Sequence, residues 1–144
     1  MLSDKFNSSK SSINNHHSEL FGITLGSIML SNLKLVKEFG GGGIGVKDEN
    51  LADSLPNQVF QEVYGEKLYP TLEDKISYIV YSIIKNHVFK DGNKRTGILM
   101  LLSLCERHNI EINCSDEDLI TLALNIASSR MSREDLRDWI RNYM

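Results

Sequence analysis

The chain of 144 residues has the length of one domain with a single buried core. Hydrophobic residues make up 41% of it and charged residues 24%, the composition of an ordinary globular protein in water. The net charge of −3 and the pI of about 5.8 exclude a global basic field that would attract nucleic acid, so no direct nucleic-acid partner is expected.

The first 18 residues, MLSDKFNSSKSSINNHHS, hold six serines and three asparagines and offer almost nothing to bury. This composition predicts a disordered polar tail over residues 1–18 and a single domain over residues 19–144.

The sequence predicts a cytoplasmic protein without a membrane span. The longest strongly apolar run, residues 76–84, is far shorter than the roughly 20 residues that cross a bilayer. The apolar stretch over residues 20–30 follows Glu19 and two histidines, whereas a signal peptide begins with a basic region. Cys105 and Cys114 form no CxxC pair and are expected to be free thiols in a reducing compartment.

Helical periodicity begins directly after the tail. Apolar residues between Leu25 and Phe39 recur at the spacing of a core-facing helix, which ends at the glycine-rich stretch of residues 39–45. Glu49 to Leu55 is predicted to be a short helix that ends at Pro56.

The segment after Pro56 is expected to lead into extended chain. Asn57 to Val63 is predicted to form another helix, and residues 64–70, YGEKLYP, an extended loop or hairpin.

Three hydroxyl residues each stand three positions before an aspartate, which is a variant of the helix capping box. The pairs are Thr71 with Asp74, Ser115 with Asp118, and Ser132 with Asp135. They predict helices over residues 72–86, 116–128 and 133–143, and apolar spacing predicts one more over 93–107. The fold class is therefore all-α, a compact bundle of six or seven helices with a short extended flap before the helix that leads to residue 87.

The stretch HVFKDGNKRTG, residues 87–97, has a composition that packing does not require. His87 continues the apolar stripe of the preceding helix, so it is expected to point toward the interior, where a purely structural histidine is the alternative. Phe89 is expected to anchor the following turn in the core. Four basic residues and one acid between Lys85 and Arg95 give a local charge of +3.

This stretch has the residues of a phosphate-handling site. Gly92, Asn93, Lys94 and Arg95 are expected at a helix N-terminus, where outward amides, the helix dipole and cationic side chains favour an anion. Asp91 would repel phosphate unless Mg²⁺ lies between them. A histidine nearby could take a proton from an attacking hydroxyl. The alternative is a capped helix start with a solvated charged face.

The stretch resembles the signature of the Fic/Doc (Fido) family, H-x-F-x-D/E-G-N-G-R-x-x-R in its Fic branch. His87, Phe89, Asp91, Gly92, Asn93 and Arg95 match that pattern. The likeness extends over roughly residues 23–143, and the ending Asn93-Lys94-Arg95 is typical of the Doc branch.

Lys94 and Ile98 depart from the Fic pattern, since they replace its second glycine and its second arginine. Fic enzymes use these positions to hold a nucleotide for transfer of AMP to a protein hydroxyl. The Doc resemblance instead implies Mg²⁺- and ATP-dependent transfer of the terminal phosphate, as a protein kinase. An AMP transferase and an inactive binding module of the same fold are the alternatives.

The resemblance also implies a role for each residue of the site. His87 is the general base toward a Ser, Thr or Tyr hydroxyl of a target protein, and Asp91 holds Mg²⁺. Gly92, Asn93, Lys94 and Arg95 cradle the phosphates of ATP. Residues 64–70 correspond to the family's flap, which would dock the target as an added strand.

The resemblance further implies a toxin with a partner. Doc-type toxins are associated with translation factors such as elongation factor Tu, and the resemblance names no target for this chain. The inhibitory S/T-x-x-x-E-G/N motif of self-restrained Fic proteins is not found in this sequence. Restraint is therefore expected from a separate antitoxin, a Phd-like segment that folds on this protein.

Overall fold

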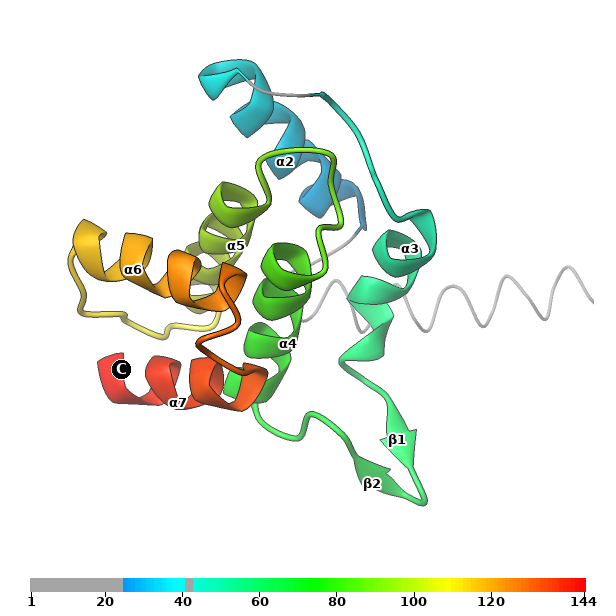
Figure 1. The fold of residues 1–144 in the computed structure, drawn as a ribbon. Coiled ribbons are helices and arrows are strands. Elements are labelled where there is room, and N and C mark those ends of the chain that lie inside the picture. The colour runs from blue at the N-terminus through cyan, green and yellow to red at the C-terminus, as the bar shows by residue number, and fades with distance from the viewer. Residues whose placement is uncertain (1–24, 41–42) are drawn as a thin grey trace, which may run out of the picture.

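The computed structural model describes residues 25–40 and 43–144, and the predicted tail lies outside these residues. The described part is helical apart from one small hairpin, which confirms the all-α fold class (Figure 1). In chain order the elements are α2 (Leu25–Phe39), α3 (Glu49–Gln58), β1 (Glu62–Val63), β2 (Glu66–Lys67), α4 (Leu72–Lys85), α5 (Asn93–Arg107), α6 (Asp116–Ala127) and α7 (Arg133–Tyr143).

The three predicted capping boxes form in full at the starts of α4, α6 and α7. At α4, the Thr71 hydroxyl accepts the Asp74 amide at 3.1 Å, while the Asp74 carboxylate accepts from Thr71. These bonds satisfy amides that lack a partner in the first turn of a helix. The predicted bounds of the three helices agree with the structure to within one residue.

The prediction for residues 49–63 is wrong in two places. Pro56 lies inside α3 instead of ending it. Its side chain is buried, as are those of Ala52 and Leu55, and this burial offsets the hydrogen bond that proline cannot donate. The expected helix over residues 57–63 does not form. Asn57 and Gln58 complete α3, and the chain turns and continues as β1.

The extended segment before α4 is a two-stranded antiparallel hairpin that pairs Glu62 with Lys67 and Val63 with Glu66. Tyr64 and Gly65 form its turn with φ of 52° and 79°. Two positive φ values in a two-residue turn match the type I′ geometry that suits the twist of a hairpin. The predicted extended segment is thus confirmed.

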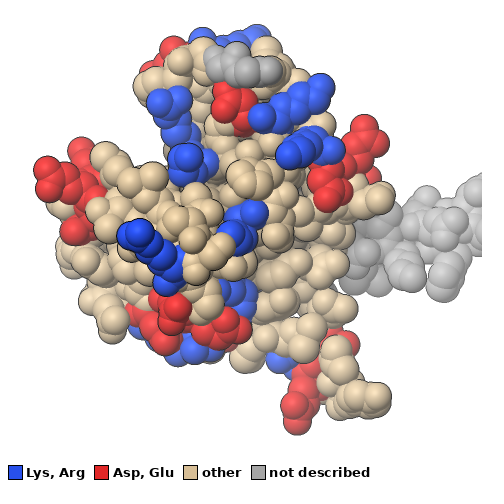
Figure 2. All heavy atoms as spheres, viewed as in Figure 1, with Lys and Arg blue, Asp and Glu red and all other residues tan. Residues whose placement is uncertain are grey.

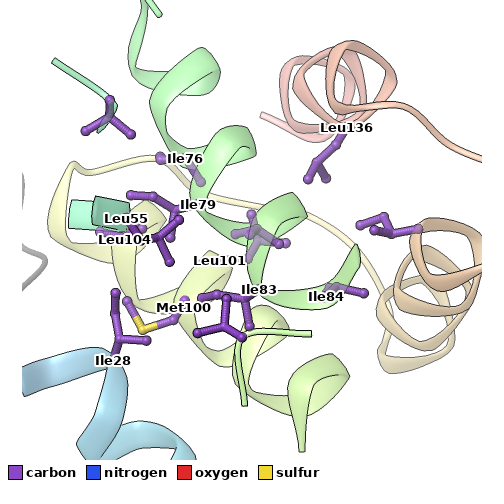
Figure 3. Close-up of a cluster of buried hydrophobic side chains, with 14 of the residues drawn as sticks. Ile28, Leu55, Ile76, Ile79, Ile83, Ile84, Met100, Leu101, Leu104 and Leu136 are labelled. Carbon is purple, nitrogen blue, oxygen red and sulfur yellow. The ribbon is translucent and has the colours of Figure 1, made fainter. Parts of the chain in front are cut away.

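Helix α4 runs through the centre of the core. Ile76, Ile79 and Ile83 are fully buried, among residues of α5, α3 and α7 (Figure 3). Full burial of such side chains contributes roughly 1.5–3 kcal/mol each relative to exposure. The stripe that the sequence predicts on this helix is therefore the main packing surface of the domain.

A buried carboxylate ties α7 to the start of α4. Asp74 is 4% exposed and accepts hydrogen bonds from Arg133 and Arg137, both at 3.3 Å. Burial raises the pKa of Asp74, but the bonds from Thr71, Arg133 and Arg137 outweigh it and hold the pKa below its usual value.

Helices α4 and α5 pack closely together at Gly97. A Cβ atom on Gly97 would lie 2.4 Å from Cγ1 of Ile84, which is closer than packed atoms allow. Only glycine fits at this position, and the contact fixes the two helices that flank residues 87–92. None of the helices within residues 25–40 and 43–144 is long and apolar enough to cross a membrane.

Substitution Gly97→Ala should destabilise the domain by about 1–3 kcal/mol, because the added methyl overpacks the contact with Ile84. Urea denaturation would measure the free energy of unfolding. The exposed helical Gly26→Ala is the matched control, for which helix propensity predicts a neutral or stabilising effect. Combining Gly97→Ala with Ile84→Ala should cost less than the sum of the two changes. Additive effects would contradict the close contact.

Candidate active site

The motif residues span the connection between α4 and α5 and the first turn of α5, which lie beside α2 (Figure 1). The connection begins at Asn86, the C-cap of α4, and ends at Gly92, the N-cap of α5. The hairpin adjoins the N-terminal end of α4, whereas the motif follows its C-terminal end. The 14 residues of α4, at 1.5 Å per residue, separate the two ends by about 21 Å. Residues 64–70 therefore do not lie beside the motif, contrary to the prediction for a flap.

His87 is exposed and does not point into the core, so the prediction of an inward histidine is wrong. The helix ends at Lys85, and His87 adopts a left-handed conformation with φ of 49° just after the C-cap. The change of backbone direction at His87 ends the helical spacing, so the next two side chains, Val88 and Phe89, are the ones buried in the core. A left-handed non-glycine residue is strained by roughly 1–2 kcal/mol. The imidazole is thus held at the surface, where an external substrate can reach it.

Phe89 is 1% exposed and packs in the core, at the position expected for an anchor. Its backbone forms an antiparallel bridge with Val46. The Lys47 amide donates to the Val88 carbonyl at 2.8 Å, and the Lys90 amide donates to the Gly45 carbonyl at 3.1 Å. Residues 45–48, which follow the glycine-rich stretch, are therefore the extended segment that lies along the motif.

The side chain of Asn93 closes the loop. Its Oδ1 accepts the Phe89 amide and its Nδ2 donates to the Phe89 carbonyl, both at 2.9 Å. The two bonds satisfy both backbone groups of a residue whose side chain is buried. Asn93 thus gives the loop its shape, a role that sequence reasoning did not assign to it. Its predicted contact with phosphate remains a prediction, and its backbone amide is the part placed to make it.

Asn32 of α2 supports the far side of the loop. It is 1% exposed, and its Nδ2 donates to the Asp91 carbonyl at 2.8 Å and to the Thr96 hydroxyl at 3.1 Å. Sequence reasoning missed this residue. The signal was available, because Asn32 stands four residues after Ile28 and four before Val36 on an otherwise apolar stripe. A polar residue there needs a buried partner.

The start of α5 differs from the starts of α3, α4, α6 and α7. Helices α3, α4, α6 and α7 each have a side-chain cap and an acidic residue in the first turn. Helix α5 has neither: Gly92 at its N-cap has φ of 73°, and Lys94 and Arg95 stand in its first turn. The first backbone hydrogen bond of α5 runs from the Thr96 amide to the Gly92 carbonyl. The amides of Asn93, Lys94 and Arg95 come before it and have no acceptor within the helix. This arrangement suits an anion.

Lys94 and Arg95 are exposed and add cationic side chains to these amides. Blue side chains spread over this end of the molecule in Figure 2, across α2 and the start of α5. The guanidinium carbon of Arg95 lies 4.4 Å from the centre of the Phe39 ring, in cation–π geometry. Phe39 was not among the predicted site residues.

Asp91 is the carboxylate that could hold a metal. One of its oxygens accepts the Gly92 amide at 2.8 Å, which orients the carboxylate next to the helix start. Among the described residues, no three His, Cys, Asp or Glu side chains gather into a metal site. A single carboxylate still fits Mg²⁺, which keeps several waters and binds through one or two carboxylates together with substrate phosphates.

An apolar groove borders the two cations. It has a volume of about 230 Å³ and is lined by Lys94, Arg95, Ile98, Leu119, Ile120, Ala123 and Leu124. Ile120 is 61% exposed and Leu124 is 53% exposed. Exposed apolar side chains that gather beside a functional site mark a surface for contact with another molecule.

Residues 11–105 match the model of the Fic/DOC family. The chain is 41% identical over 57 residues to "Toxin Doc" of Mycolicibacterium smegmatis, a match that covers 40% of this chain and 44% of that protein. It is 28% identical over 101 residues to "Protein kinase doc" of Escherichia phage P1, covering 70% of this chain and 79% of that protein.

Substitution Asn93→Ala should destabilise the domain by about 1–3 kcal/mol, because it leaves the amide and carbonyl of Phe89 without partners. Urea denaturation would measure the loss, and hydrogen exchange should show faster exchange of the Phe89 amide. Asn50→Ala, at an exposed position of α3, is the matched control. A stability equal to that of the wild type would contradict the bridging role of Asn93.

Proposed function

The chain belongs to the Fic/DOC family, and from this premise we propose that it is a Doc-like toxin that transfers a phosphoryl group from ATP to a hydroxyl of a target protein. The observation that carries the proposal is the start of α5. There a left-handed glycine, uncapped amides, Lys94 and Arg95 come together at a helix end without an acid in its first turn. Such an end suits the polyphosphate of a nucleotide.

His87 is proposed as the general base. Its imidazole takes the proton of a target Ser, Thr or Tyr hydroxyl while the oxygen forms a bond to the γ-phosphorus. The bond from that phosphorus to the bridging oxygen breaks, and ADP leaves. The exposed position of His87 supports this role, because the hydroxyl arrives from outside the domain.

Gly92, Asn93, Lys94 and Arg95 are proposed to hold the phosphates. The backbone amides would bind phosphate oxygens, and Arg95 would fork onto two of them. Asp91 would hold Mg²⁺, which when bound neutralises charge on the phosphates during transfer.

The target segment is proposed to add as a strand beside residues 43–47. This segment already pairs with the motif loop through Val46 and Phe89, and Ile44 and Lys47 are exposed. An extended segment next to the site can receive a peptide through backbone hydrogen bonds, with side-chain contacts adding selectivity.

Restraint by a separate antitoxin is proposed to act through the groove between α5 and α6. Its lining combines exposed apolar residues, among them Ile120 and Leu124, with the cations Lys94 and Arg95. An amphipathic segment with acidic residues would complement both parts and cover the two cations. Growth arrest on expression of the chain alone, and copurification of a small acidic protein from its native cells, are expected. Harmless expression without any copurified partner would contradict this proposal.

The labelling experiment that tests the reaction uses cell lysate, Mg²⁺ and ATP labelled at either the γ- or the α-phosphate. The wild-type chain should transfer γ-label to a protein band, and His87→Ala should lose at least about a hundredfold of that activity, as expected for a general base. His108→Ala, at the other end of α5, is the matched control.

Each label distinguishes one reaction. Transfer from the α-position would replace the kinase by an AMP transferase and would mean that Lys94 leaves the nucleotide pose of Fic enzymes unchanged. Transfer of neither label, with intact folding and no antitoxin present, would contradict both enzymes and favour a binding module.

A further inference from the structure

Three residues of α2 meet the motif from one face of that helix. Asn32, Val36 and Phe39 follow the spacing i, i+4, i+7, which places side chains in one row along a helix. All three lie outside the signature stretch of residues 87–97. Together they lie against Asp91, Gly92, Arg95 and Thr96, so α2 supports the motif around the start of α5.

The first two contacts fix the backbone of the loop. Asn32 bonds to the Asp91 carbonyl and the Thr96 hydroxyl, on either side of Gly92. A Cβ atom on Gly92 would lie 3.3 Å from both Asn32 Nδ2 and Val36 Cγ2. The left-handed turn at Gly92 therefore rests directly on α2, and the orientation of the first amides of α5 depends on it.

The third contact concerns a side chain of the site. Phe39 is 55% exposed, so its ring contributes little to the core. The ring instead faces Arg95, whose guanidinium carbon lies 4.4 Å from its centre. A guanidinium stacked on an aromatic face keeps its N–H groups at the edge, where they remain available for phosphate oxygens. Arginine otherwise loses considerable rotamer freedom when it binds a ligand.

We propose that Phe39 is a positioning residue, which preorganises Arg95 for the phosphates of the nucleotide, while Asn32 and Val36 hold the turn at Gly92 that begins its helix. The proposal rests on the proposed function, because that function identifies the anion bound by Arg95 as the phosphates of ATP. Phe39 does not touch the reacting atoms. Its effect is to reduce the entropy that Arg95 loses on binding.

The contact itself is tested by NMR of the arginine Nε–H groups, without any nucleotide. The Arg95 signal, identified by its loss in Arg95→Lys, should carry a ring-current shift. Phe39→Leu should remove that shift and Phe39→Tyr should restore it. An Arg95 signal that does not move in Phe39→Leu would overturn the proposal.

The consequence is tested by calorimetric titration of the full chain with Mg·ATP. Phe39→Leu should weaken binding about two- to fivefold, the range expected from a cation–π contact at an exposed site. Phe39→Tyr should bind like the wild type. Tyr64→Leu is the matched control, because it removes a fully exposed ring from the hairpin at the other end of α4.

A double-mutant cycle separates positioning from a general structural effect. In the Arg95→Ala background, Phe39→Leu should have no further effect on Mg·ATP binding, because the residue it positions is absent. An equal loss in both backgrounds, or no loss in the wild-type background, would overturn the positioning role alone. A wild-type chain without affinity for Mg·ATP would overturn the proposed function, and the positioning role with it.

Discussion

The close packing of α4 against α5 at Gly97 is the constraint from which the site follows. Because a side chain at this position would collide with Ile84, the two helices lie nearer to each other than ordinary side chains permit. The residues from Asn86 to Gly92 must then connect them within a short space. The chain meets this requirement with two left-handed residues, one just after α4 and one just before α5. The first is His87, whose left-handed conformation places its own side chain at the surface. The second is Gly92, which precedes the first turn of α5.

A connection of this kind is stable only if its backbone groups find partners, since it packs against the core. Three separate parts of the chain supply them. Asn93 bonds both backbone groups of Phe89, residues 45–48 pair with the chain on either side of Phe89, and Asn32 bonds the Asp91 carbonyl. The loop is therefore held by a helix start, an extended segment and a second helix. The exposed side chains of the candidate site are therefore carried on a backbone whose polar groups are hydrogen-bonded on three sides.

Features that depend on residues close in sequence were predictable. The capping boxes join residues three apart, and the start of α5 follows from Gly92, so these elements were predicted correctly. The orientation of His87 was not, because one left-handed residue redirects a stripe that periodicity assumes to continue. The apolar stripe around Asn32 indicates that its side chain is buried, but its partner Asp91 lies 59 residues away and nothing local specifies that pairing. The surroundings of the candidate residues thus depend on the tertiary fold, which local patterns do not specify.

The charges at the start of α5 show what the sequence favours there. A helix N-terminus is stabilised by acids and destabilised by cations, typically by 0.3–1 kcal/mol for each charge. Helices α3, α4, α6 and α7 follow this rule with acids in their first turns, whereas α5 has Lys94 and Arg95 and no side-chain cap. Local stability would favour the opposite choice at each of these positions. A bound anion would make both the missing cap and the two cations favourable, because it would accept hydrogen bonds from the free amides and pair with Lys94 and Arg95. Among α3 to α7, the helix start that departs from the rule, with two cations in its first turn, is therefore the one that carries the motif.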